Sequence, residues 1–138
     1  MSDKVLRLRG EMQVGMPTRA GLVYSEEILR RLVDDINEMV ENKKPVVGTV
    51  LSRHKADVKE DEVTHEVVGA EYKDGRIFVS VRLLDNSRAE VLERLAPDVS
   101  FVPKMVVKGG SCVEKFLTMK AKLVTDYDEL VRVDIGVE

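Results

Sequence analysis

Three residues that lie far apart in the sequence, His54, Ser100 and Asp134, are of the types that serine-based nucleophilic chemistry requires. A serine hydroxyl attacks a carbonyl carbon when a base accepts its proton, a third group orients that base, and nearby donors stabilise the oxyanion. Ser100 lies in the extended, β-branched stretch 98–107, where alternation places it on the same side as Asp98 and opposite Phe101. Such a strand could present the hydroxyl outside the core.

Each of these residues also has an ordinary structural interpretation. Ser100 equally fits a serine of an unremarkable strand, and His54 fits a loop position. The second histidine, His65, fits a strand position with its ring packed beside Val63 and Val67. Residue types alone therefore leave both interpretations open.

A metal site is the second chemical hypothesis for this part of the chain. Its candidate ligands are His54, Asp57, Glu60, Asp61 and His65. Their spacing matches no strong zinc or calcium signature, and consecutive acidic residues are typical of a solvated loop. We therefore expect no metal ion and no other cofactor.

Cys112 is the single cysteine, so the chain cannot form an internal disulfide. Secreted domains of this size often carry several bridges, so a reducing compartment is expected. Cys112 follows a Gly-Gly-Ser turn and has no histidine nearby in sequence, which favours a structural or incidental thiol. The start of the chain has no apolar run typical of a signal peptide, which predicts a soluble protein that is not exported by its own signal.

The length of 138 residues fits one domain, 1–138, with a single core. The net charge of -3, with both signs mixed along the chain, argues against a dedicated phosphate-binding surface, so nucleic acid is not an expected partner. No stretch approaches the length of a membrane span, so no membrane partner is expected either.

Helix signals occur twice. Ser25 is a good N-cap, Glu26 and Glu27 follow in the first turn, and apolar residues then recur at helical spacing as far as Val40. Pro45 forbids continuation of this long helix. A short helix over 87–95, capped by Asn86 or Ser87, should turn three apolar residues inward: Val91, Leu92 and Leu95.

The rest of the chain favours strands. Segments 4–16 and 45–52 have strand character, and segments 62–72 and 76–84 flank a Lys-Asp-Gly turn and predict a hairpin. Stretch 98–107 is expected to pair, across Gly109-Gly110, with the alternating strand that includes 117–123. A last strand over 129–137 should place Val131 and Val133 on one face, and Leu130, Arg132 and Asp134 on the other. The predicted fold class is α/β (α+β), a mainly antiparallel, barrel-like sheet with one long and one short helix.

The order of these motifs resembles the prohead core proteases of tailed phages, capsid-maturation serine proteases with a fold related to the herpesvirus assembly protease. That family has an Asn-Gly-Arg-x-Tyr segment before a helix, matched here by 20–24 (AGLVY) before SEEILRRLV. Its Gly-Glu-Leu segment running into a histidine is matched by Gly48-Thr49-Val50 and His54, and its Ser-His pair by Thr64-His65. Its Val-Ser strand and closing Leu-Val strand with an Asp are matched by Val99-Ser100 and 130–135.

The resemblance implies a serine endopeptidase of prohead maturation with His54 as general base, Ser100 as nucleophile, Asp134 as orienting carboxylate and His65 in a supporting or structural position. It implies scaffold and capsid proteins as partners and substrates, inside the assembling prohead or virion-associated in the host cytoplasm. Because the edges of a Val-rich sheet need cover, we also expect a homo-oligomer.

The sequence departs from the family pattern around Ser100. The family commonly has Ser-Ser-Arg-Gly, where Arg and Gly shape the oxyanion site, whereas here Phe101, Val102 and Pro103 follow the serine. The backbone N–H of Phe101 or of a neighbour is the expected oxyanion donor. The alternative function is a non-catalytic structural protein, associated with capsid or scaffold, on the same fold.

Overall fold

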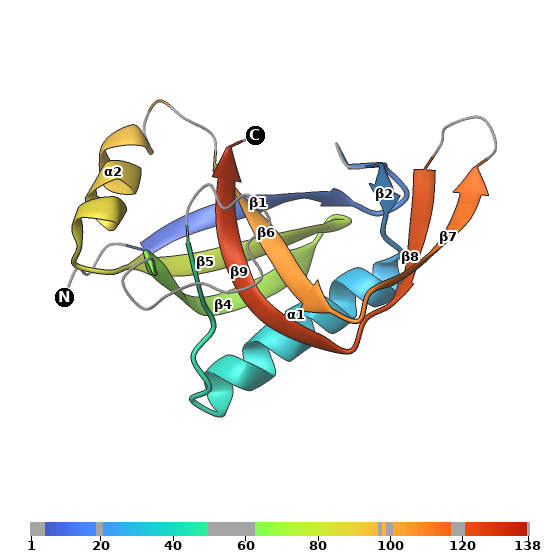
Figure 1. Ribbon diagram of the computed structural model, residues 1–138, viewed down its shortest axis with the longest axis horizontal. Helices are drawn as coiled ribbons and strands as arrows, with labels where there is room; N and C mark the ends of the chain where they lie inside the picture. The colour runs from blue at the N-terminus through green and yellow to red at the C-terminus, as the bar shows by residue number, and fades with distance from the viewer. Residues whose placement is uncertain are drawn as a thin grey trace.

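The computed structural model describes residues 5–18, 21–49, 63–96, 98, 101–116 and 121–137. Within these residues, two helices and nine strands follow one another along the chain (Figure 1): β1 (Val5–Gln13), β2 (Leu22–Val23), α1 (Glu26–Glu41), β3 (Val47–Gly48), β4 (His65–Lys73), β5 (Arg76–Leu83), α2 (Ser87–Leu95), β6 (Phe101–Lys108), β7 (Ser111–Phe116), β8 (Ala121–Asp126) and β9 (Glu129–Val137). In the part of the chain described, no helix is long and apolar enough to cross a membrane.

The strands form a curled, mainly antiparallel half-barrel. One sheet has the order β1-β5-β4-β3, and the antiparallel pair β6-β9 crosses in front of it in Figure 1. The two are joined at both ends, since β1 contacts β6 and β3 contacts β9. A third sheet, β2-β8-β7, extends to one side. The predicted fold class is confirmed.

The β4-β5 hairpin was predicted from alternation and turn chemistry. Asp74 and Gly75 both have positive φ, 53° and 79°, as a two-residue hairpin turn requires. One face of β5 is buried throughout, with exposed fractions of 0–2% at Ile77, Val79, Val81 and Leu83. This hairpin forms the centre of the large sheet.

Helix α1 has the predicted start and the predicted apolar stripe. The Ser25 hydroxyl accepts the Ile28 N–H at 3.3 Å, which satisfies one of the free donors of the first turn. Its buried residues are Ile28, Leu29, Leu32, Val33 and Ile36. They pack the helix against β4 and β5 on one side and β8 and β9 on the other.

Helix α2 is correct in position, but of the three residues predicted to face inward only Leu92 does so. Asn86 is the N-cap, accepting the Ala89 N–H at 2.9 Å. Ala89 and Leu92 are buried, whereas Val91 and Leu95 are 40% and 42% exposed. The short helix lies at one end of the molecule (Figure 1), where one narrow stripe at i, i+3 spacing is enough to attach it.

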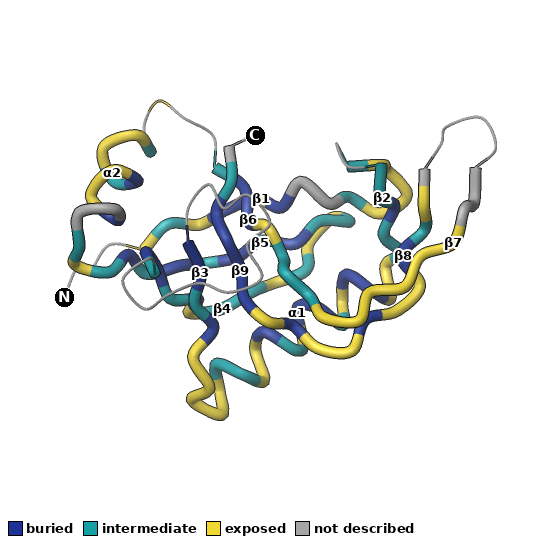
Figure 2. Tube along the Cα trace, in the orientation of Figure 1, coloured by how far each residue is buried: buried dark blue, intermediate teal, exposed yellow. Residues whose placement is uncertain are grey.

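The predicted pairing of stretch 98–107 with the strand through 117–123 is also wrong. β6 pairs with β9, and β7 pairs with β8. Gly109 is in the left-handed region with φ 73°, and an added Cβ there would lie 2.1 Å from the Asp128 carboxylate. After β6 the chain turns at Gly109 and enters β7, which belongs to the side sheet. The pairing partner of β6 is β9, which comes much later in the chain. Figure 2 shows β9 buried over its middle and the beginning of β7 exposed.

A polar clamp fixes α1 to the turn before β9. The Tyr127 hydroxyl donates to Asp35, and the Arg31 guanidinium lies 4.1 Å from the Tyr127 ring centroid and donates to the Tyr127 carbonyl at 2.6 Å. Tyr127 is 2% exposed, and burial together with the Asp35 carboxylate raises the pKa of its phenol. The turn before β9 is thus held against α1 by the neutral Tyr127 phenol and by two charged side chains, Arg31 and Asp35, that each contact Tyr127.

We predict that Tyr127→Phe lowers the free energy of unfolding by about 1–3 kcal/mol, because a hydrogen bond to a charged group is lost without a change in shape. Urea denaturation followed by circular dichroism measures the difference. Asp34→Asn, which removes the exposed neighbouring carboxylate, is the control and should change stability by less than about 0.5 kcal/mol. Equal stability of the two variants would contradict the clamp.

Candidate functional site

Strand β9 carries the one residue of the predicted triad that the structure describes, Asp134. β9 is buried on both faces here, with exposed fractions of 4% at Arg132, 0% at Val133 and 1% at Asp134. Val133 belongs to the hydrophobic core, so Arg132 and Asp134 share the opposite face. Two charged side chains are therefore enclosed beside each other on one strand.

The predicted faces of β9 hold from Arg132 onward and are wrong before it. Val106 pairs with Arg132 and Val107 with Leu130, so Val131 is the extra residue of a β-bulge. The bulge leaves Val131 43% exposed and turns Leu130 into the core. It shifts the alternation by one residue, which a strict period of two cannot predict.

The Asp134 carboxylate accepts hydrogen bonds from two directions. The Thr49 backbone N–H donates to Oδ1 at 3.0 Å. The Arg132 Nε–H donates to Oδ1 at 3.0 Å and to Oδ2 at 3.1 Å. Donors from β9 itself and from the segment after β3 thus set the orientation of the carboxylate.

Thr49 reaches Asp134 because Gly48 allows two backbones to approach closely. A Cβ on Gly48 would lie 1.9 Å from the Val133 carbonyl oxygen and 2.8 Å from His65 Nε2. The Ile135 N–H then donates to the Thr49 carbonyl at 3.0 Å. Glycine is therefore required at this position for space.

His65, the first residue of β4, links that strand to β9. Its Nε2 lies 2.6 Å from the Val133 carbonyl oxygen, which can only accept, so Nε2 carries the hydrogen. Nδ1 lies 2.7 Å from the Thr64 hydroxyl. His65 is 0% exposed, and burial lowers the pKa of the imidazole, against opposing effects of the Val133 carbonyl and Asp134. The ring is thus neutral, and each of its nitrogens has a hydrogen-bond partner, which fits a structural role for His65.

The other predicted site residues are placed only in part. His54 and Ser100 lie outside the described residues, so their convergence with Asp134 remains a prediction. Phe101 is the first residue of β6, is half-buried and pairs with Val137. The metal-ligand candidates of 54–61 also lie outside the described residues, and within those residues no group of His, Cys, Asp or Glu could hold a metal ion.

Sequence reasoning missed Gly48, Thr49 and Arg132 as members of the network. A glycine inside the apolar run 45–52 is a signal of close backbone approach. Arg132 stands two residues before Asp134, so it shares a strand face with it, but nothing local indicated that this face would be covered. These two signals could have suggested the network without fixing its partners.

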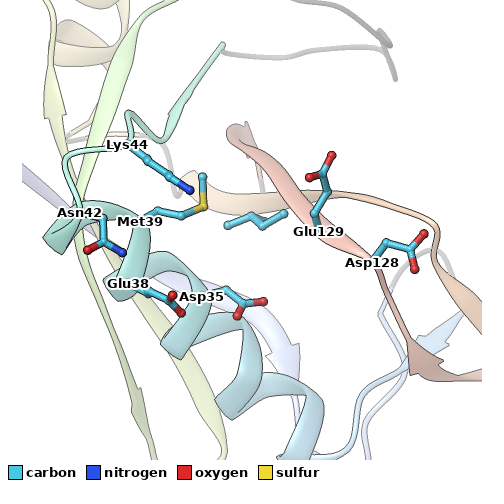
Figure 3. Close-up of a pocket in the computed structure, with 8 residues that line it drawn as sticks. Asp35, Glu38, Met39, Asn42, Lys44, Asp128 and Glu129 are labelled. Atoms are coloured by element: carbon cyan, nitrogen blue, oxygen red, sulfur yellow. The ribbon is translucent and has the colours of Figure 1, made fainter.

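A separate pocket of about 330 Å³ lies between the C-terminal half of α1 and the turn that leads into β9 (Figure 3). It is lined by Asp35, Glu38, Met39, Asn42, Lys44, Asp128, Glu129 and Leu130. Half of the lining residues are acidic, and none of them is a predicted site residue. The network around Asp134 is thus distinct from this pocket.

No protein-family model matches the sequence, and no curated protein sequence matches it. Among solved structures there is a match that spans almost the whole chain. The fold is similar to that of the bacteriophage T4 capsid assembly protease, gp21. The TM-score is 0.72 at 18% sequence identity, over 96% of this chain and 80% of that protein's chain. The resemblance predicted from the motif order is thus confirmed at the level of the fold.

We predict that Gly48→Ala lowers the free energy of unfolding by about 3 kcal/mol or more, because the added Cβ meets backbone atoms that cannot rotate away. Chemical denaturation measures the loss. Gly69→Ala is the matched control, since Gly69 is also in the large sheet and a Cβ there meets nothing within 4 Å. Its stability should stay within about 1 kcal/mol of wild type. A Gly48→Ala protein as stable as Gly69→Ala would contradict the close approach.

His65 should make stability pH-dependent. Its folded-state pKa is lowered, so below the ordinary histidine pKa of about 6.5 the unfolded chain binds a proton that the folded chain refuses. Stability should therefore fall with decreasing pH below about 6.5, with a histidine contribution of up to about 1.4 kcal/mol per pH unit.

The contribution of His65 is separated from that of the carboxylates by comparison with His65→Gln, which does not titrate. Denaturation curves between pH 5 and 8 should show a shallower slope below pH 6.5 for the variant. Parallel slopes for the two proteins would mean that His65 is protonated equally in both states.

Proposed function

We propose that the chain is a serine endopeptidase of phage prohead maturation that cleaves scaffold and capsid proteins during head assembly. The observation that carries the proposal is the buried, oriented carboxylate of Asp134, on a fold similar to that of a capsid assembly protease. A buried ion pair such as that of Arg132 and Asp134 is by itself a weak source of stability. In a protease of the Ser-His-Asp type, a buried carboxylate of this kind orients the catalytic histidine.

In the proposed reaction Ser100 Oγ attacks the carbonyl carbon of the scissile peptide while His54 accepts the hydroxyl proton. Asp134 remains ionised, holds the imidazole in the correct tautomer and stabilises the imidazolium. The C–N bond then breaks, His54 returns the proton to the leaving amine, and water hydrolyses the acyl-enzyme by the same steps. The oxyanion donor is the backbone N–H of Phe101 or of a neighbour.

The chain connects the proposed residues to the described network at two points. His54 follows Thr49 by five residues, and an extended chain covers at most about 3.6 Å per residue. Ser100 is joined directly to Phe101, the first residue of β6, and β6 pairs with β9, which carries Asp134. These connections are compatible with a site built around Asp134.

A non-catalytic structural protein on the same fold is the second candidate. It is favoured by the residues after Ser100, where Val102 is 2% exposed and Pro103 is buried in place of the Arg-Gly of the family pattern. Loss of one oxyanion donor costs about a hundredfold to a thousandfold in rate. The two candidates share scaffold and capsid proteins as partners and the prohead as location, so activity separates them.

We predict that a fluorophosphonate probe labels the wild-type protein at Ser100, identified by peptide mass spectrometry. Ser100→Ala should remove the labelled peptide, and His54→Ala should slow labelling by at least about a hundredfold, because the hydroxyl loses its base. Cleavage of a co-expressed scaffold protein should be lost in both variants, with melting temperatures close to that of wild type.

The control is Ser111→Ala, which removes an exposed serine at the start of β7 and should be labelled as fast as wild type. A wild-type protein that is neither labelled nor able to cleave the scaffold protein would favour the structural candidate.

A further inference from the structure

Arg132 and Asp134 form a buried ion pair within one strand. They are 4% and 1% exposed, and the Arg132 Nε–H contacts both carboxylate oxygens, at 3.0 and 3.1 Å. Buried ion pairs are weak sources of stability, since an apolar pair of similar volume often serves folding as well or better. What an apolar pair cannot provide is a negative charge held at a fixed position.

The contacts restrict that charge to one orientation. Thr49 N–H approaches Oδ1 from the segment after β3, and Arg132 approaches both oxygens from two residues earlier on β9. The guanidinium is planar and stays charged at any physiological pH, so it constrains direction as well as charge. Without Arg132 the carboxylate would lose its charged partner, and a buried charge without one is costly.

We propose that Arg132 is a positioning residue for Asp134. It holds the carboxylate in the orientation in which Asp134 can accept the N–H of the catalytic histidine. The inference rests on the proposed function for its catalytic consequence, but the coupling between Arg132 and the Asp134 carboxylate stands on the contacts alone. Arg132 acts through Asp134, so it should matter only while Asp134 is present.

The catalytic consequence is tested by a double-mutant cycle on the rate of fluorophosphonate labelling. Arg132→Met should slow labelling at least tenfold, and Arg132→Lys should recover part of the rate, because an ammonium restores the charge without the planar geometry. In an Asp134→Asn background, Arg132→Met should have no further effect beyond about twofold. Equal slowing in both backgrounds, or no slowing in either, would overturn the inference.

The positional coupling is tested without reference to activity, by NMR of two backbone amides. The Thr49 amide donates to Asp134, whereas the Ile135 amide donates to the Thr49 carbonyl and serves as an internal control. In Arg132→Met the Thr49 amide should move upfield and exchange with solvent at least tenfold faster, and the Ile135 amide should not change. Arg132→Lys, with its melting temperature measured, replaces the Met variant if that protein does not fold.

The two measurements separate failure of the inference from failure of the proposed function. A wild-type protein that is not labelled, but whose Thr49 amide responds to Arg132→Met, would refute the protease and leave the positioning role standing. An unchanged Thr49 amide in the folded variants would refute the positioning role, whatever the labelling rate.

Discussion

The close approach of Gly48 to the backbone of Val133 is the constraint on which the rest of the site depends. It leaves no room for a Cβ, and it places the Val133 carbonyl within 2.6 Å of His65 Nε2. On one side of this contact β3 pairs with β4, and on the other the Thr49 carbonyl accepts the Ile135 N–H. β9 is thereby joined to the large sheet, and its polar face is enclosed.

Enclosure turns ordinary strand residues into a buried polar network. On an exposed strand, Arg132 and Asp134 would be a solvated pair worth little. Buried, the same carboxylate needs donors, and it finds them in Thr49 and Arg132. His65 contributes as a neutral link, since a charged imidazole in the same place would be penalised by burial. The chemistry assigned to Asp134 therefore depends on glycine at a position far from it in sequence.

Features set by local signals could be predicted from the sequence. The Ser25 cap and apolar stripe of α1, the Asp74-Gly75 turn of the hairpin, and the extent of β9 all follow from residues within one element. The motif order was sufficient to predict the fold class.

Features set by distant contacts could not be predicted in this way. Pairing of β6 with β9 joins strands separated by the whole β7-β8 hairpin, and the bulge at Val131 is defined only by the partner strand. The exposure of Val91 and Leu95 depends on how little of α2 the body of the protein covers. For the candidate site, the sequence predicts a role for Asp134, which no observation yet tests, whereas its hydrogen-bond partners Thr49 and Arg132 depend on the same long-range packing.

The proposed function requires that a nucleophile and its base meet at the Asp134 carboxylate. A crystal structure of the protein after reaction with a fluorophosphonate tests it most directly, because the adduct marks the nucleophile and fixes the site. We expect phosphorus bonded to Ser100 Oγ, one nitrogen of the His54 ring within about 4 Å of that oxygen, and the other ring nitrogen hydrogen-bonded to Asp134. A structure in which His54 and Ser100 lie on opposite faces of the molecule, with Asp134 bonded only to Thr49 and Arg132, would contradict it.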